Sequence, residues 1–186
     1  MIQDINQCID VLSDGGLILY PTDTIWGIGC DATQPHAIEK IFKLKGRSSS
    51  KALITLVSSE YMLEKIVVDV PEMAWDLIEH ADKPLTIIYD QVRTISKGAL
   101  ADDGSCAIRL INHSFCQKLI NRFGKPIIST SANTSGHASP TTFSEIETSI
   151  LNGVDFIVNF GQNESSEHAA SNIIKLGHNG TVKIIR

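Results

Sequence analysis

The sequence predicts an α/β fold with an open, mixed β-sheet and helices packed on it, and two observations support this. Short apolar segments typical of strands alternate with segments whose apolar residues recur at helical spacing. The strand-like segments at the C-terminal end follow one another closely, which predicts antiparallel pairing in part of the sheet. The sheet should therefore be mixed and not all-parallel.

The expected helices are marked by apolar periodicity and by residues that begin or end helices. In the first, Ile2, Ile5 and Leu12 share one face. In the second, Thr33 is the expected N-cap and Pro35 lies in the first turn. Further helices are expected over residues 61–66, 71–78, 112–123 (with Asn112 as the cap) and 144–151.

The expected strands are short apolar segments bounded by residues typical of turns. They cover residues 17–20, 52–57, 85–89, 106–110, 126–129, 155–158, 172–176 and 182–185. A long polar segment, residues 130–142, follows the strand at 126–129 and is expected to form a loop.

The composition predicts an ordinary water-soluble enzyme or binding protein that forms a single domain over residues 1–186. No apolar run approaches the roughly 20 residues of a membrane helix, and the N-terminus lacks the basic region of a signal peptide. We therefore expect a cytoplasmic protein with no membrane partner. A net charge of −5 argues against a general nucleic-acid-binding surface. The four cysteines have no metal-binding spacing and should be small, half-buried thiols in a reducing compartment.

Several common catalytic patterns are disfavoured. The segment Gly27-Ile-Gly29-Cys-Asp-Ala32 fits a dinucleotide-binding fingerprint, but Pro21 and a polar TDT precede it in place of a clean buried strand, so a nicotinamide-dependent dehydrogenase is not favoured. The sequence contains no P-loop and no nucleophile elbow. The six histidines show no metal-ligand spacing, so we assign no metal site on the protein.

Two polar segments are candidates for binding phosphate. Residues 45–51, KGRSSSK, combine three cations with three hydroxyls, and phosphate oxygens favour such donors. The alternative is a solvated basic turn that neutralises the end of a helix. Residues 129–142 place hydroxyls and amides directly after a strand, where α/β sheets bind ligands. The alternative is a turn whose side chains satisfy its own backbone.

Two charged residues, Asp23 and Arg109, each allow two interpretations. Asp23, in the segment PTDT, could cap a turn or assist a metal ion. Arg109 lies inside an apolar strand, where a buried charge without a partner is costly. Arg109 either points to solvent or faces an anionic ligand in a cleft.

Taken together, these segments resemble the threonylcarbamoyl-AMP synthase family in its short, single-domain form. The similarity covers nearly the whole chain through PTDTIWGIGCDA, IFKLKGR, ALITLVSS, PLTIIY, CAIRL, KPIISTSANTSGHASPTT and AASNII. The resemblance implies a twisted sheet that lines a large concave cavity. It also implies a nucleotidyltransferase that makes L-threonylcarbamoyladenylate and pyrophosphate from L-threonine, bicarbonate or CO2, and ATP, with Mg2+ accompanying the nucleotide.

The resemblance assigns the nucleotide site to five residues. Lys45 and Arg47 match a K-x-R pair on the ATP phosphates and are the expected catalytic residues. Ser131 and Asn133 match an S-x-N pair on the same nucleotide, and Thr141 matches a further nucleotide contact.

The resemblance assigns threonine binding to Thr24, Arg109 and Ser171. The chain departs from the family pattern at Leu56, where some members carry a histidine that touches threonine. It also departs at residues 80–86, HADKPLT, which lack the family's WPG.

The resemblance further implies a downstream partner, a transferase complex that places the threonylcarbamoyl group on adenosine 37 of tRNA. The alternative function is a non-catalytic protein of the same fold that binds nucleotide or double-stranded RNA, or tRNA. Retention of both the K-x-R and the S-x-N pairs favours the enzyme.

Overall fold

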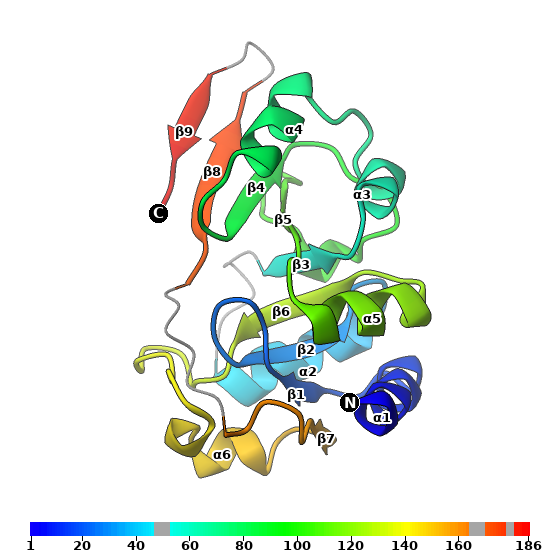
Figure 1. Ribbon diagram of the computed structural model, residues 1–186, viewed down its shortest axis with the longest axis vertical. Helices are drawn as coiled ribbons and strands as arrows, with labels where there is room; N and C mark the ends of the chain where they lie inside the picture. The colour runs from blue at the N-terminus through cyan, green and yellow to red at the C-terminus, as the bar shows by residue number, and fades with distance from the viewer. Residues whose placement is uncertain (47–52, 164–169, 178–180) are drawn as a thin grey trace.

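The computed structural model describes residues 1–46, 53–163, 170–177 and 181–186, and its main feature is one twisted, open sheet (Figure 1). The strand order is β7-β1-β2-β6-β3-β5-β4-β8-β9. The strands are β1 (Ile18–Tyr20), β2 (Gly27–Asp31), β3 (Ile54–Val57), β4 (Leu85–Tyr89), β5 (Cys106–Leu110), β6 (Ile127–Ser131), β7 (Phe156–Ile157), β8 (Asn172–Leu176) and β9 (Val182–Ile184).

The pairing within the sheet confirms the mixed architecture. β1 pairs with β7, β3 with β5, and β4 with β8 in parallel. The remaining pairs are antiparallel, including β8 with β9 at the C-terminal end, as the short connection between those segments predicts.

The helices lie close to the predicted ranges. They are α1 (Ile2–Ser13), α2 (Pro35–Lys45), α3 (Glu60–Ile66), α4 (Glu72–Glu79), α5 (Ser114–Phe123) and α6 (Thr148–Leu151), with 3-10 turns η1 (Lys97–Ala99) and η2 (Phe143–Glu145). Within the described ranges, no helix has both the length and the apolar character needed to cross a bilayer.

The alternation of side chains along β1 divides the core into two layers. Ile18 and Tyr20 pack in a cluster with α1 and α5, whereas Leu19 belongs to the cluster on α2. Helix α2 therefore covers one face of this half of the sheet, and α1 and α5 cover the other (Figure 1). A third cluster joins α3 and α4 to β4, β5 and β8.

Local signals at the helix ends explain most of the boundaries. Gly46 and Gly124 end α2 and α5 in the left-handed conformation, with φ of 59° and 74°.

Two expected N-caps are wrong. The Thr33 amide and hydroxyl bind the Asp31 carboxylate instead, and α2 begins after Gln34; α5 begins after His113 and not after Asn112.

The dinucleotide-like segment forms β2, a fully buried strand between β1 and β6. It is therefore not a phosphate-binding turn, and its glycines serve packing. A Cβ built on Gly29 would lie 2.6 Å from Cε1 of Tyr20 and 3.0 Å from the carbonyl oxygen of Ile128. The Tyr20 ring thus occupies the space over the strand where any side chain at position 29 would begin.

We expect Gly29→Ala to lower the free energy of unfolding by about 1–3 kcal/mol, because the added methyl meets backbone that cannot move away cheaply. Gly98→Ala is the matched control, since its Cβ would meet side-chain atoms only, the nearest being the Ile38 Cγ2 methyl at 3.3 Å. Urea denaturation of both variants measures the difference. Equal stability of the two variants would contradict this account of β2.

Burial controls the chemistry of the cysteines. Cys8, Cys30, Cys106 and Cys116 are free thiols and fully buried, deeper than the half-buried state that we expected. Loss of hydration raises the pKa of Cys8 to about 12, with a further contribution from the Asp4 charge. Burial likewise raises the pKa of Cys106 to about 11.

We therefore expect the native thiols to react with Ellman's reagent at pH 8 at least about 10²-fold more slowly than in guanidinium chloride, because so little thiolate is present. The denatured chain should release four equivalents of chromophore, one for each cysteine. A native thiol that reacts at the denatured rate would show that its segment opens readily to solvent.

Candidate functional site

A cavity of about 280 Å³ lies where the loop after β1 meets the end of β6 and the segment that enters β8. Its volume is at the lower end of small-molecule sites, which span roughly 300–1,000 Å³. Apolar walls come from Ile25, Trp26, Leu53, Ile54 and Ile173. Hydroxyls come from Thr22, Thr24, Ser129, Thr130, Ser131, Ser139 and Ser171.

Arg109 supplies a buried positive charge to this cavity. It projects from β5, is 4% exposed, and its Nη2 lies 3.0 Å from the Asp23 carboxylate. Its Nε is buried and has no hydrogen-bond partner among the described residues. Arg109 lines the cavity, so its positive charge favours an anionic ligand there. Arg109 thus faces the cleft and not solvent, and Asp23 serves as its counter-ion.

The opposite wall comes from the C-terminal part of the chain. Ser171 is 2% exposed, and its hydroxyl lies 2.8 Å from the hydroxyl of Thr86. Arg186 also lines the cavity, and its Nε and Nη2 donate to the Ser171 carbonyl at 3.2 and 3.0 Å. Sequence reasoning missed Arg186. Arg186 lies two positions after β9, a strand that itself contains Lys183, so no isolated cation in an apolar strand marked it.

The turn between β1 and β2 arranges two threonines at the cavity. The Thr22 hydroxyl donates to the Ile25 carbonyl at 2.7 Å and lies 2.9 Å from the Thr24 hydroxyl. Thr24 is 3% exposed and lines the cavity, as does Thr22. The turn is therefore held by its own side chains, which fixes where both hydroxyls lie.

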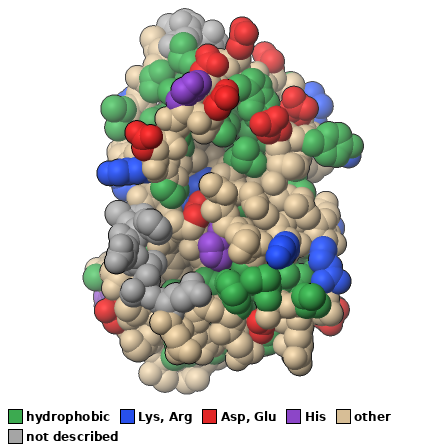
Figure 2. All heavy atoms as spheres, viewed as in Figure 1, with side chains coloured by type: hydrophobic (Ala, Val, Ile, Leu, Met, Phe, Trp, Pro, Cys, Tyr) green, Lys and Arg blue, Asp and Glu red, His purple; other side chains and the backbone are tan. Residues whose placement is uncertain are grey.

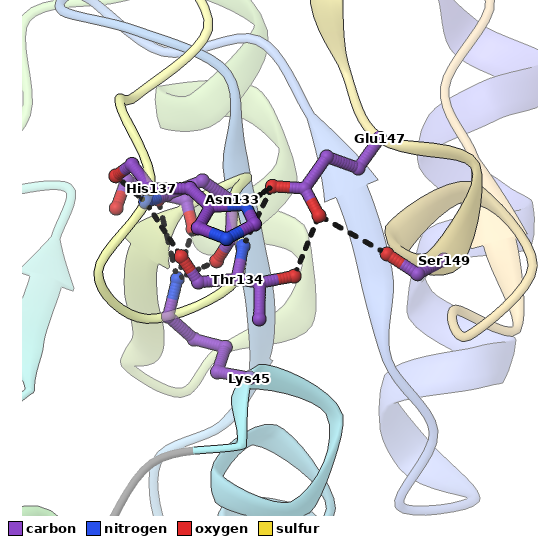
Figure 3. A network of polar contacts seen from close by, with 7 residues as sticks. Lys45, Asn133, Thr134, His137, Glu147 and Ser149 are labelled. Atoms are coloured by element: carbon purple, nitrogen blue, oxygen red, sulfur yellow. Dashed lines mark hydrogen bonds and ion pairs between the residues drawn. The ribbon is translucent and has the colours of Figure 1, made fainter.

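Lys45 joins helix α2 to the loop that follows β6 (Figure 3). Its ammonium group donates to the carbonyls of Ser131 and Asn133 at 2.5 and 2.6 Å, and its own carbonyl accepts from the Ser135 amide at 3.0 Å. Lys45 is 2% exposed. The two segments expected to bind one nucleotide therefore meet directly, but the ammonium contacts that the structure shows are to this loop.

The other predicted nucleotide residues occupy different positions. Ser131 lines the cavity, whereas the Asn133 amide nitrogen donates to the carbonyls of Thr134 and His137 at 3.1 and 2.7 Å. Asn133 thus shapes the loop. For Asn133, the structure therefore fits the alternative interpretation, in which side chains of residues 129–142 satisfy the backbone of their own turn. Ser131 fits the interpretation that this segment lines a ligand site.

Thr141 and Arg47 complete the predicted set. Thr141 is exposed, and its amide and hydroxyl donate to the Glu145 carboxylate at 2.8 and 3.0 Å. Arg47 lies outside the described residues. The predicted threonine residues Thr24, Arg109 and Ser171, in contrast, all line one cavity.

Leu56 does not take the place of a ligand-binding histidine at the cavity wall. It is fully buried in the core cluster that also contains Tyr20 and Phe115. In the part of the chain that the structure describes, no group of three or more His, Cys, Asp or Glu side chains is placed to hold a metal ion.

These features define an α/β protein with a cation-bearing, hydroxyl-rich cavity between two parts of a mixed sheet. The family model named Sua5_yciO_yrdC, described as "Telomere recombination", matches residues 10–186, so the chain belongs to this family.

Curated relatives carry the name threonylcarbamoyl-AMP synthase. The protein from Saccharophagus degradans is 35% identical over 136 residues, which are 73% of this chain and 71% of that protein. The protein from Vibrio parahaemolyticus is 34% identical over 149 residues, which are 78% and 80% of the two chains. These relatives support an enzyme of this type.

Solved structures show the same fold. Sua5 of Pyrococcus abyssi, solved in complex with L-threonine, superposes with a TM-score of 0.84 at 26% identity and covers 98% of this chain. This chain spans 53% of that protein, about half its length. YciO of E. coli superposes with a TM-score of 0.86 at 21% identity. The superposition covers the whole of this chain and 89% of YciO. At this identity, the likeness shows the fold alone.

The buried ion pair between Arg109 and Asp23 should contribute to the free energy of unfolding. Arg109→Met should lower the free energy of unfolding by about 3–5 kcal/mol, because it leaves a nearly buried carboxylate without its partner. Arg109→Met combined with Asp23→Asn should recover part of that loss. Chemical denaturation of the two single variants and the double variant gives the coupling energy, and simple additivity would show that the pair is not energetically linked.

Proposed function

We propose that the protein is an L-threonylcarbamoyladenylate synthase, which converts L-threonine, bicarbonate or CO2, and ATP into the adenylate and pyrophosphate. The observation that carries the proposal is Arg109. This buried cation lines a cavity whose lining also contains the other two residues predicted to bind threonine, Thr24 and Ser171. A relative of the same fold was solved with L-threonine.

Arg109 is the group proposed to bind the threonine carboxylate. A guanidinium donates two parallel hydrogen bonds to a carboxylate, and burial strengthens them because water does not compete. The ion pair with Asp23 holds the guanidinium in one orientation. Thr24 and Ser171 place hydroxyls at the same cavity and would contact the amine and hydroxyl of the substrate.

The nucleotide would lie toward Ser131, with the loop that follows β6 beside it. In the chemical step, a carbamate oxygen attacks the α-phosphorus and forms a new P–O bond, while the bond to pyrophosphate breaks. Every reactant is anionic, so positioning and neutralisation of charge should dominate. Arg47, Arg186 and Lys45 are the cations proposed to offset the charge, and Mg2+ bound mainly through phosphate oxygens would neutralise the rest.

Lys45 has a second role in this proposal. Its ammonium group holds the backbone of Ser131 and Asn133, so it fixes the loop that would contact the nucleotide. Removing Lys45 should therefore affect both the charge near the phosphates and the shape of their binding loop.

The proposed biological role is the supply of threonylcarbamoyl groups for adenosine 37 of tRNA, through a separate transferase complex in the cytoplasm. Direct double-stranded RNA binding is less favoured. The net charge is −5, and acidic side chains gather over the end of the molecule that carries α4 (Figure 2). RNA binding depends mainly on positive surface charge.

The test is pyrophosphate release by the purified protein with MgATP, bicarbonate and L-threonine. Release should require threonine, and L-serine should support it poorly. Lys45→Ala and Arg47→Ala should each lower the rate by about 10²-fold or more, the effect of losing one transition-state contact.

Near-normal rates in both variants would remove Lys45 and Arg47 from the catalytic set. No threonine-dependent release by the wild-type protein, together with salt-dependent RNA binding, would instead support the non-catalytic alternative.

A further inference from the structure

The loop that follows β6 is held on a second side, away from Lys45, by the carboxylate of Glu147 (Figure 3). The Thr134 hydroxyl donates to Oε2 of Glu147 at 2.7 Å, and Nδ1 of His137 donates to Oε1 at 2.9 Å. The Thr134 amide adds a longer contact to Oε1, at 3.4 Å, and the Ser149 hydroxyl one to Oε2, at 3.3 Å. One carboxylate thus gathers two loop residues that are three positions apart.

The position of Glu147 before helix α6 suggests a capping role, but its side chain does not cap that helix. Glu147 is the N-cap residue of the four-residue helix α6, yet its side chain makes no capping hydrogen bond to that helix. Its carboxylate is about one-third exposed, and the hydrogen bonds from Thr134 and then from His137 lower its pKa. The Glu147 carboxylate is therefore ionised at neutral pH, and its oxygens accept hydrogen bonds from the loop.

The residues that Glu147 holds are the ones that orient Asn133. The Asn133 amide donates to the carbonyls of Thr134 and His137, and the Asn133 carbonyl accepts from Lys45. A continuous chain of hydrogen bonds therefore runs from Glu147 through Thr134 and His137 to Asn133 and Lys45. Ser131 and Ser139, on either side of this loop, both line the cavity.

We propose that Glu147 is a positioning residue for the nucleotide site, which touches no substrate and fixes the loop from Ser131 to Ser139 in its binding shape. This inference rests on the function proposed above. Glu147 acts on the outer side of the loop as Lys45 acts on the inner side, so removal of the carboxylate should loosen the loop without unfolding the core.

The test compares Glu147→Ala and Glu147→Gln in the pyrophosphate assay. Glu147→Ala should raise the KM for ATP by about tenfold and leave the KM for threonine within about twofold, because Arg109 and its neighbours are untouched. Glu147→Gln keeps one acceptor oxygen and should lie between the wild type and Glu147→Ala. Glu64→Gln, which changes an exposed acid of α3 in the same way, should match the wild type.

A double-mutant cycle separates positioning from a general structural effect. Thr134→Val should raise the KM for ATP, and its combination with Glu147→Ala should be little worse than Glu147→Ala alone, because both changes break the same link. Hydrogen exchange of the amides from Thr134 to His137 should be faster in Glu147→Ala, while the amides of β2 and β6 keep their wild-type rates.

The inference is overturned if folded Glu147→Ala keeps the wild-type KM for ATP, or if both KM values rise together with faster exchange across the core. A wild-type protein that releases no pyrophosphate with threonine would instead overturn the proposed function. In that case, unchanged exchange of the loop amides in Glu147→Ala would also overturn the inference.

Discussion

The buried ammonium group of Lys45 is the interaction on which the candidate site depends. Removing a charge from water is costly, and here two backbone carbonyls at 2.5 and 2.6 Å compensate for it. Lys45 is the last residue of α2, and Gly46 turns the chain away in the left-handed conformation. The length of α2 therefore decides where the ammonium lies, and the ammonium holds the backbone where β6 passes into its loop.

The sequence predicted the elements well wherever a local physical signal was present. Apolar periodicity predicted α1, and a short apolar segment predicted β5. Prediction failed where another contact took the place of the expected one. Thr33 has the chemistry of an N-cap, but the Asp31 carboxylate binds it first. β2 was missed because its glycines resemble a turn until the Tyr20 ring beside them is known.

The candidate site was predictable in its residues but less so in their contacts. Thr24, Arg109 and Ser171 lie far apart in the sequence and meet at one cavity. The family resemblance, and not periodicity, brought them together in advance. No sequence pattern could show that the ammonium of Lys45 donates to carbonyl groups, or that Arg186 lines the same cavity, because both facts depend on how distant segments pack.

The strand order has a consequence for protein synthesis. The cavity takes one wall from the turn at Thr22–Thr24 and another from Ser171 and Arg186, so its two sides are translated almost a full chain length apart. The core around α1, α2 and α5 can be complete while the second wall is still inside the ribosome. A nascent chain of this protein should therefore pack the half of the sheet around α1, α2 and α5 before β8 joins the third cluster and the binding site closes, so substrate cannot guide the early stages of folding.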